Sequence, residues 1–185
     1  DRVQIVSAGT SGRRLRTTIL RAGPEGALCC PDEVVDQEWE FRGGALKQIA
    51  PDRPPRILSP DIIAGGSWRL SAWDVDVPAP DTPPVTLAFS EGLFSGKSGC
   101  NSYFVGVSGG ETPGDLRLGP VGVTQMACPD QGADEVELRF LAQLGAVVKF
   151  GFMAGRLMLM YEGDAGSGVM LFSRPPGGSG DGKPP

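Results

Sequence analysis

The chain has 185 residues, enough for one folded domain with a small additional segment and too few for two large domains. Seventeen Lys and Arg stand against 22 Asp and Glu, a formal net charge of −5 at pH 7. No overall positive field therefore attracts nucleic acid or an anionic membrane. The sequence contains no histidine, which excludes an imidazole base, a Ser-His or Cys-His nucleophile pair and a histidine metal ligand.

Residues 1–50 are predicted to form a small β segment. Three runs have strand character: 15–20, 34–41 and 45–49, the last two joined by a tight turn at Gly43-Gly44. These runs carry few large apolar side chains, so we expect the segment to pack on a second domain or on another chain.

A proline-rich stretch follows at 51–64 and is predicted to be an extended linker, because proline fixes φ and disfavours helix at the preceding residue. At the other end of the chain, residues 175–185 form a Pro/Gly tail with nothing to bury, for which disorder is expected.

Residues 65–174 form the predicted main domain. Alternation of apolar and polar residues predicts many short strands, at 68–72, 85–89, 93–96, 100–107, 116–118, 121–127, 147–153, 157–161 and 169–172. One helix is predicted from Glu135 to Leu144, with Asp134 as its N-cap and Glu137 as the capping-box partner. The predicted fold is mainly β: a small curled antiparallel sheet or half-open barrel with one packing helix.

Two motifs that suggest ligands fail on spacing. Ser95-Gly96-Lys97-Ser98 resembles the end of a phosphate loop, but Gly92 and Gly96 are separated by three residues where that loop needs four. The methionines suggest copper(I), but Met158 and Met160 alternate with Leu157, Leu159 and Tyr161 along one strand, which favours packing. No cofactor and no metal is therefore predicted.

Four cysteines are present: Cys29, Cys30, Cys100 and Cys128. None forms a Cys-x-x-Cys pair, and an even number in a Gly/Pro-rich β chain fits disulfides, which persist in oxidising compartments. The chain begins at Asp1 without Met, and we expect that a targeting segment has been removed. The predicted location is extracytoplasmic: the bacterial periplasm, cell envelope or cell surface.

Residues 66–174 resemble the META domain family, whose best-known bacterial members are HslJ-type envelope proteins. The resemblance rests on Trp68-x-Leu70, on Gly99-Cys100-Asn101 with Tyr103, on Leu116-x-Leu118-Gly119-Pro120, on Thr124-x-Met126-Ala127-Cys128 and on Glu137-x-x-Phe140 with Leu144. Family members usually place glycine two residues after the tyrosine, whereas here Gly106 comes three residues after it.

The resemblance implies a β-rich domain with a helix over a strongly curved sheet and no established catalytic chemistry. It assigns structural motif positions to Trp68, Gly99, Asn101, Tyr103, Thr124 and Met126. It also implies that Cys100 and Cys128 pair in a structural disulfide, with two free thiols or a redox switch as alternatives.

Cys29 and Cys30 are adjacent, and we expect a vicinal bridge or a fold staple rather than a metal site; pairing with another chain, or a hairpin without any activity, stays open. The segment 15–49 is faintly similar to lipoproteins of the LppP/LprE type, over too short a span to imply a function.

These observations predict a non-catalytic exported envelope protein, an accessory or structural subunit that binds a protein partner through its β surfaces and termini. It would bind no nucleic acid and meet a membrane only indirectly or through a removed or upstream anchor. The alternative is a small-ligand or antibiotic-binding stress protein of the envelope, which would use the mouth of the curled sheet.

Overall fold

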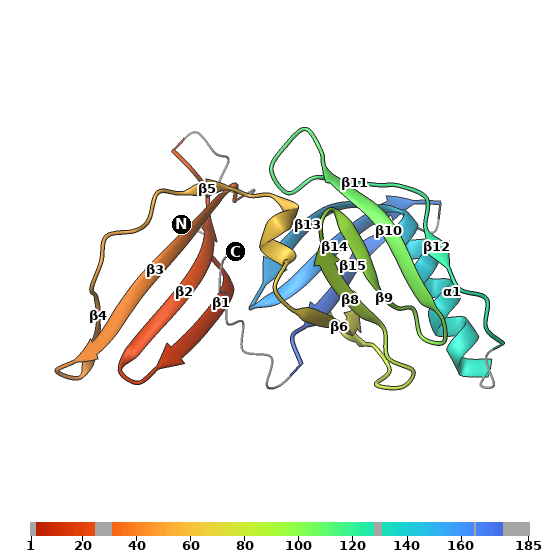
Figure 1. The fold of residues 1–185 in the computed structure, drawn as a ribbon, viewed down its shortest axis with the longest axis horizontal. Helices are drawn as coiled ribbons and strands as arrows, with labels where there is room; N and C mark the ends of the chain where they lie inside the picture. The colour runs from red at the N-terminus through yellow and green to blue at the C-terminus, as the bar shows by residue number, and fades with distance from the viewer. Residues whose placement is uncertain (1–2, 25–30, 128–130, 165, 176–185) are drawn as a thin grey trace. The chain divides into compact units, whose positions relative to one another are not determined.

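The computed structural model describes residues 3–24, 31–127, 131–164 and 166–175. Contacts divide the chain into two compact units, Asp1–Leu58 with Phe152–Gly155 and Ser59–Gly151 with Arg156–Pro185. Two antiparallel sheets organise the fold (Figure 1).

The sheet of the first unit has the strand order β1-β2-β3-β4, with β5 also paired to β3. The strands are β1 (Gln4–Ser11), β2 (Arg14–Arg21), β3 (Glu33–Arg42), β4 (Ala45–Gln48) and β5 (Arg56–Ile57). The three strands predicted at 15–20, 34–41 and 45–49 are confirmed. The sequence did not reveal β1, because the run QIVSAGTS has no regular alternation of large apolar side chains.

The second unit contains a ten-stranded antiparallel sheet with the path β11-β10-β9-β8-β6-β15-β14-β13, while β12 pairs with β10 and β7 with β6. Its strands are β6 (Ser67–Trp73), β7 (Val77–Pro78), β8 (Thr86–Ser90), β9 (Leu93–Lys97), β10 (Ser102–Gly109), β11 (Leu116–Leu118), β12 (Gly122–Val123), β13 (Val147–Met153), β14 (Arg156–Gly163) and β15 (Gly166–Ser173). A 3₁₀ turn, η1 (Pro60–Ile63), precedes β6.

The two ends of this path meet, so the sheet is a nearly closed barrel. An isolated bridge pairs Asp115 with Lys149 of β13, and the Lys149 ammonium lies 3.1 Å from the Asp115 carboxylate. The Phe150 N–H donates to the Gly114 carbonyl at 2.8 Å. The hydrogen bond from the Thr112 hydroxyl contributes most to lowering the pKa of Asp115, and Lys149 lowers it further. Together they outweigh desolvation, which raises this pKa.

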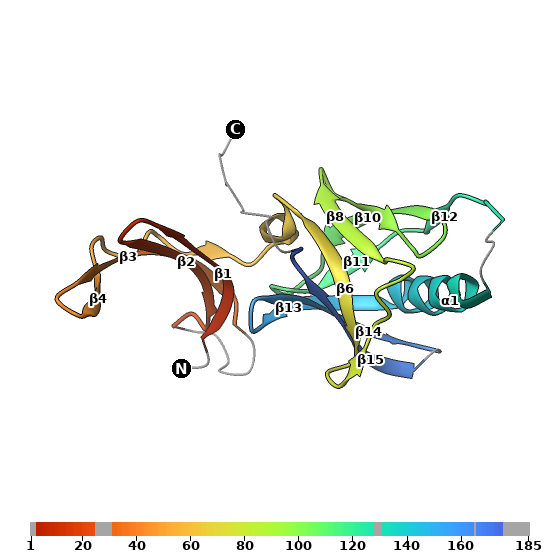
Figure 2. The same ribbon diagram turned by 90° about the horizontal axis from the view of Figure 1, so that it is seen from below.

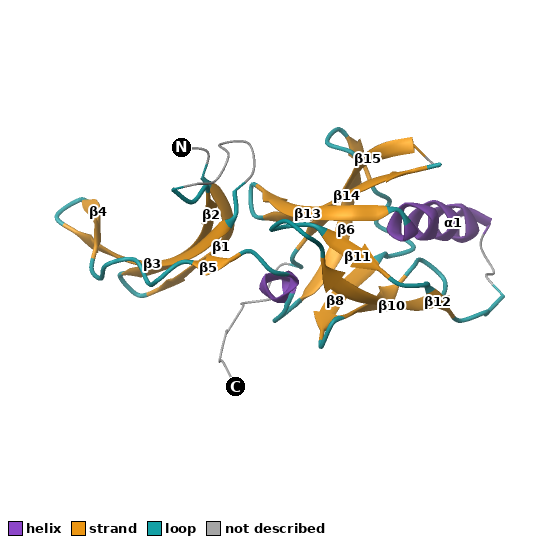
Figure 3. Cartoon of the chain, turned by 90° about the horizontal axis from the view of Figure 1, so that it is seen from above, coloured by secondary structure: helices purple, strands orange, loops and turns teal. Residues whose placement is uncertain are grey.

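The one α-helix among the described residues, α1 (Gln131–Gly145), lies between β14 and β15 on one side and β10 and β12 on the other (Figures 2 and 3). Its Phe140 is fully buried and packs edge to face on Tyr103 at 5.0 Å and on Phe172 at 6.5 Å between ring centroids. The predicted class, mainly β with one helix in a half-open barrel, is confirmed.

Two local predictions are wrong. A strand was expected at 121–127, but in this range only Gly122–Val123 is a strand. The Thr124 hydroxyl and the Met126 N–H both donate to the side-chain oxygen of Asn101, and these hydrogen bonds replace strand pairing. The helix begins at Gln131, so Asp134 lies in its first turn, and the Glu137 carboxylate bonds to another segment rather than capping the helix. No helix among the described residues is long and apolar enough to cross a membrane.

Candidate functional site

The family-like motif residues of the sequence meet around Asn101, a buried amide in the turn between β9 and β10 that is 5% exposed. Its backbone N–H and its Nδ2 both donate to the Glu137 carboxylate on α1, each at 2.8 Å. The Ser98 hydroxyl donates to the same carboxylate at 2.6 Å. The helix is thereby tied to the β9–β10 turn through charge-assisted hydrogen bonds.

The carbonyl side of the same amide faces the segment after β12. The Asn101 Oδ1 accepts from the Thr124 hydroxyl at 2.9 Å and from the Met126 N–H at 2.8 Å. The Thr124 N–H in turn donates to the Ser102 carbonyl at 3.0 Å. One asparagine side chain therefore joins three segments that are distant in sequence: the β9–β10 turn, the end of β12 and the helix.

The electrostatics of this cluster favour an ionised Glu137. Burial raises the pKa of its carboxyl, but the hydrogen bonds from Ser98 and from both N–H groups of Asn101 outweigh burial, and the net pKa lies below the usual range. A carboxylate held in this way is a poor general acid at neutral pH, because it stays deprotonated. Its chemistry here is that of a hydrogen-bond acceptor that orients the turn.

The residues before Asn101 need special backbone geometry. Gly99 has φ +117°, a conformation that side-chain-bearing residues rarely adopt, and a Cβ there would lie 3.4 Å from the Ala133 carbonyl. Cys100 is disulfide-bonded. Cys128, the partner that the family resemblance implies, lies outside the described residues together with Cys29 and Cys30, so these pairings stay predictions.

The other two motif positions lie in the barrel core. The buried Tyr103 hydroxyl donates to the Thr86 carbonyl at 2.9 Å, and burial raises its pKa. Trp68 is fully buried, its indole N–H donates to the Ile63 carbonyl at 3.0 Å, and the Arg174 guanidinium lies 4.5 Å from its ring.

The structure thus brings Gly99, Asn101, Thr124 and Met126 together at one corner of the barrel and places Tyr103 and Trp68 in the interior. Sequence reasoning did not assign Ser98 or Glu137 to this corner. Glu137 is part of the family-like run Glu137-x-x-Phe140. Its position one helical turn before a buried aromatic residue is the signal that could have indicated an inward-facing Glu137 side chain.

A second polar cluster lies near the other end of α1. The Gln143 Nε2 donates to the Tyr161 hydroxyl at 3.0 Å, while the Gln143 Oε1 is buried without a hydrogen-bond partner. Burial is the main cause that raises the pKa of Tyr161, and the charge of Asp74 adds to it. No sequence pattern indicated this cluster.

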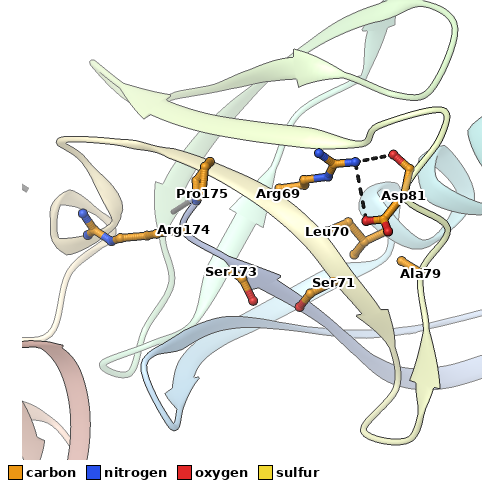
Figure 4. A pocket seen from close by; sticks show the side chains of 8 residues that line it. All are labelled: Arg69, Leu70, Ser71, Ala79, Asp81, Ser173, Arg174 and Pro175. Atoms are coloured by element: carbon orange, nitrogen blue, oxygen red, sulfur yellow. Dashed lines mark hydrogen bonds and ion pairs between the residues drawn. The ribbon is translucent and has the colours of Figure 1, made fainter. Parts of the chain in front are cut away.

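Two shallow pockets lie on the second unit. The first, about 230 Å³, is lined mainly by β6 and the end of β15 (Figure 4). Its Arg69 guanidinium already bonds the Asp81 carbonyl and lies 3.7 Å from the Asp81 carboxylate. The second, about 360 Å³, borders the barrel closure at Asp115 and Lys149. Pockets that enclose drug-sized ligands span about 300–1,000 Å³ and are largely apolar.

Metal-ligating groups do not gather in the part of the chain that the structure describes: no three His, Cys, Asp or Glu residues stand close enough to hold an ion. Met158 and Met160 are half-buried on the face of β14 opposite the buried Leu157, Leu159 and Tyr161, which confirms the predicted alternation.

Apolar side chains are exposed on the outer face of the barrel sheet at β9 and β10. Phe104 is 58% exposed and Leu93 is 40% exposed. Phe104 pairs across the sheet with Ser95 and Gly122, and Leu93 pairs with Gly106. The aromatic ring therefore stands on a platform of small residues, and its face is accessible to a partner.

The described residues of the second unit define a small antiparallel β-barrel domain in which the helix α1 covers one side and is tied to the β9–β10 turn by the polar cluster around Asn101. The family model of the META domain matches residues 61–175, and the chain belongs to the META domain family. META domains occur in bacterial envelope-associated proteins and are not a known enzyme family. A solved structure, the NMR structure of a protein from Burkholderia xenovorans, is similar: 26% sequence identity, 74% of this chain and 99% of that chain covered, TM-score 0.48. No curated protein matches the chain.

Proposed function

We propose that this protein is a non-catalytic, exported accessory protein of the bacterial envelope that binds a protein partner through the outer face of its barrel sheet. The exposed Phe104 with Leu93 is the observation that carries the proposal. Exposed aromatic side chains on a flat surface are typical anchors in protein interfaces.

The Asn101 cluster supports a non-catalytic role. The polar groups that meet there bond to one another, and the Glu137 carboxylate accepts three hydrogen bonds from the turn it orients. An acid or base catalyst needs a group that can exchange a proton with a substrate, and this carboxylate is committed to the fold.

Native mass spectrometry of the protein, gently extracted from its source envelope under non-reducing conditions, tests the proposal. A complex of fixed stoichiometry that contains this chain is the expected result. A monomer in repeated mild extractions would contradict the proposal. The same spectra give the oxidation state, since two disulfides lower the mass by four hydrogens relative to the reduced chain.

The alternative, an envelope protein that binds a small ligand or antibiotic, can be tested at the pocket at Arg69, which Ser173 and Ser71 also line (Figure 4). The Ser71 hydroxyl donates to the Leu171 carbonyl at 3.0 Å, and its oxygen can still accept a hydrogen bond from a ligand. A ligand that binds only the folded state raises the unfolding temperature. If this alternative holds, one compound class in a panel of envelope-active antibiotics should raise the unfolding temperature, and Ser71→Ala should reduce that increase. If it does not hold, no compound should raise the unfolding temperature.

A further inference from the structure

Two hairpin turns lie side by side at one end of the first unit's sheet. The β1–β2 turn contains Gly12 and Arg13, and the β3–β4 turn contains Gly43 and Gly44. The Phe41 N–H donates to the Arg13 carbonyl at 2.9 Å, which holds the two turns together. Figure 1 shows both turns at the same end of this sheet. We call residues 10–17 and 38–48 the hairpin tip.

The hairpin tip is basic although the chain as a whole is acidic. It contains five basic residues, Arg13, Arg14, Arg16, Arg42 and Lys47, and two acidic ones. The acidic residues are partly buried and paired: Glu38 lies 3.3 Å from Arg16, and Glu40 lies 2.5 Å from Arg42. All five basic side chains are exposed, so the tip presents a net positive surface to solvent.

The same tip exposes apolar side chains. Phe41 and Leu46 are directly opposed across β3 and β4, and each is 51% exposed. Trp39, two residues before Phe41, shares this face and is half-buried opposite Leu15. Glu38 and Glu40 alternate with these residues and lie on the opposite face. Arg14, Arg16 and Lys47 pair with these glutamates and therefore lie on that face too, whereas Arg13 lies in the β1–β2 turn. The apolar side chains and most of the cations thus occupy opposite faces of the sheet and come together at its end, where the two turns lie.

We propose that the hairpin tip binds membrane surfaces rich in anionic lipids end on, with the two turns foremost. Phe41 and Leu46 on one face enter the boundary between headgroups and acyl chains, while Arg13 in the turn and Arg14 and Lys47 on the other face contact lipid phosphates. Peripheral membrane binding depends on this combination of a few exposed apolar side chains and several nearby cations. The proposal does not depend on the protein partner proposed above.

The dimensions of the tip favour a membrane over an acidic protein. A stable protein interface buries about 800 Å² on each partner around an apolar centre, whereas the large apolar side chains exposed in the tip are Phe41 and Leu46 alone. A lipid surface needs no shape complementarity, and it brings many phosphates within reach of cations that point from both turns.

Vesicle flotation of the full chain tests the proposal. At low salt, we expect a partition coefficient at least about tenfold higher for vesicles of phosphatidylcholine and phosphatidylglycerol in equal parts than for phosphatidylcholine alone. High salt should abolish the difference, because it screens exposed charges within a few Å. Equal partitioning into both vesicle types would overturn the proposal.

Two pairs of variants locate the surface. Arg13→Gln with Arg14→Gln should lower partitioning about tenfold, whereas Lys97→Gln with Arg117→Gln, which removes the same charge from the second unit, should not change it. Phe41→Ser should weaken binding, whereas Leu138→Ser, at an apolar position on α1 that is even more exposed (70% against 51%), should not.

Near-ultraviolet circular dichroism checks that each variant folds. Equal losses for the tip pair and the control pair would overturn the proposal. The proposal would also be overturned if the wild-type chain did not bind anionic vesicles and the Arg13→Gln/Arg14→Gln variant lost a protein partner. That result would assign the tip to an acidic protein surface.

Discussion

The two units of this protein distribute their aromatic and apolar side chains differently. The barrel of the second unit encloses Trp68, Phe94, Phe140 and Phe172, each fully buried. Among residues 3–58, the aromatic side chains are Trp39, which is half-buried, and Phe41, which is half exposed. The barrel encloses its large aromatic side chains except Phe104, whereas the first sheet buries aliphatic side chains such as Leu20 and Val35 and leaves Phe41 at its surface, where a partner or a lipid layer can reach it.

The largest effect that this comparison predicts is at Phe140. Phe140→Ala should lower the free energy of unfolding by about 3–5 kcal/mol, because it removes a ring packed between Tyr103 and Phe172. The matched change Phe41→Ala should cost less than about 1 kcal/mol, since half of that side chain is already in water. Urea unfolding of the two variants measures both values, and similar costs would contradict the contrast between the units.

Asn101→Ala should cost about 2–4 kcal/mol, because it removes one of the three hydrogen bonds that the Glu137 carboxylate accepts and also removes the side-chain oxygen to which the Thr124 hydroxyl and the Met126 N–H donate. The matched control is Gln143→Leu, which removes a buried amide whose oxygen has no partner. That change should alter the free energy of unfolding by less than about 1 kcal/mol. If Gln143→Leu proved the more destabilising of the two, the Asn101 cluster would not be the organising contact of the barrel.

Gly96→Ala should cost about 1–3 kcal/mol, because a Cβ at Gly96 would lie 2.1 Å from the Thr86 carbonyl oxygen, which is backbone and cannot move aside easily. Gly106→Ala, in the neighbouring strand, meets no atom within 4 Å and should be neutral or slightly stabilising. Thermal unfolding of both variants measures the difference; a neutral Gly96→Ala would mean that β8 and β9 are not closely apposed.

The smallest expected effect is a change in acid sensitivity at Glu137. Its pKa is lowered in the folded state, so its contribution to stability is complete above the ordinary Glu pKa of about 4.3 and is lost as the pH falls toward the folded value. Glu137→Gln should therefore flatten the fall in stability below about pH 5. Glu135→Gln, an exposed position on the same helix, should leave that fall unchanged, and an unchanged slope in Glu137→Gln would contradict the role of the carboxylate.

Alternation of apolar residues was sufficient to predict most of the fold. It placed β11 and β13 at their observed bounds and located the helix through Phe140 and Leu144. It failed at β1, where small polar residues carry no pattern, and at 121–127, where side-chain hydrogen bonds to Asn101 replace strand pairing. Periodicity reports burial along one segment and contains no information about such contacts between segments.

The same reason limits what the sequence says about the sites. Asn101 and Thr124 were singled out only by resemblance to the META domain family, and nothing in their spacing indicated that Asn101 would bond to both Thr124 and Glu137. The arginines of the hairpin tip are close together in the sequence, at positions 13, 14 and 16, but its apolar face exists only because the strand register places Phe41 opposite Leu46.

The central claim is that the motif residues build the barrel while the exposed face at Phe104 does the binding. Native mass spectrometry of envelope extracts that contain wild type, Phe104→Ser or the control Leu138→Ser tests it most directly. The account predicts a complex of fixed stoichiometry for wild type and Leu138→Ser, and folded monomer for Phe104→Ser. The same complex in all three samples, or in none, would contradict it.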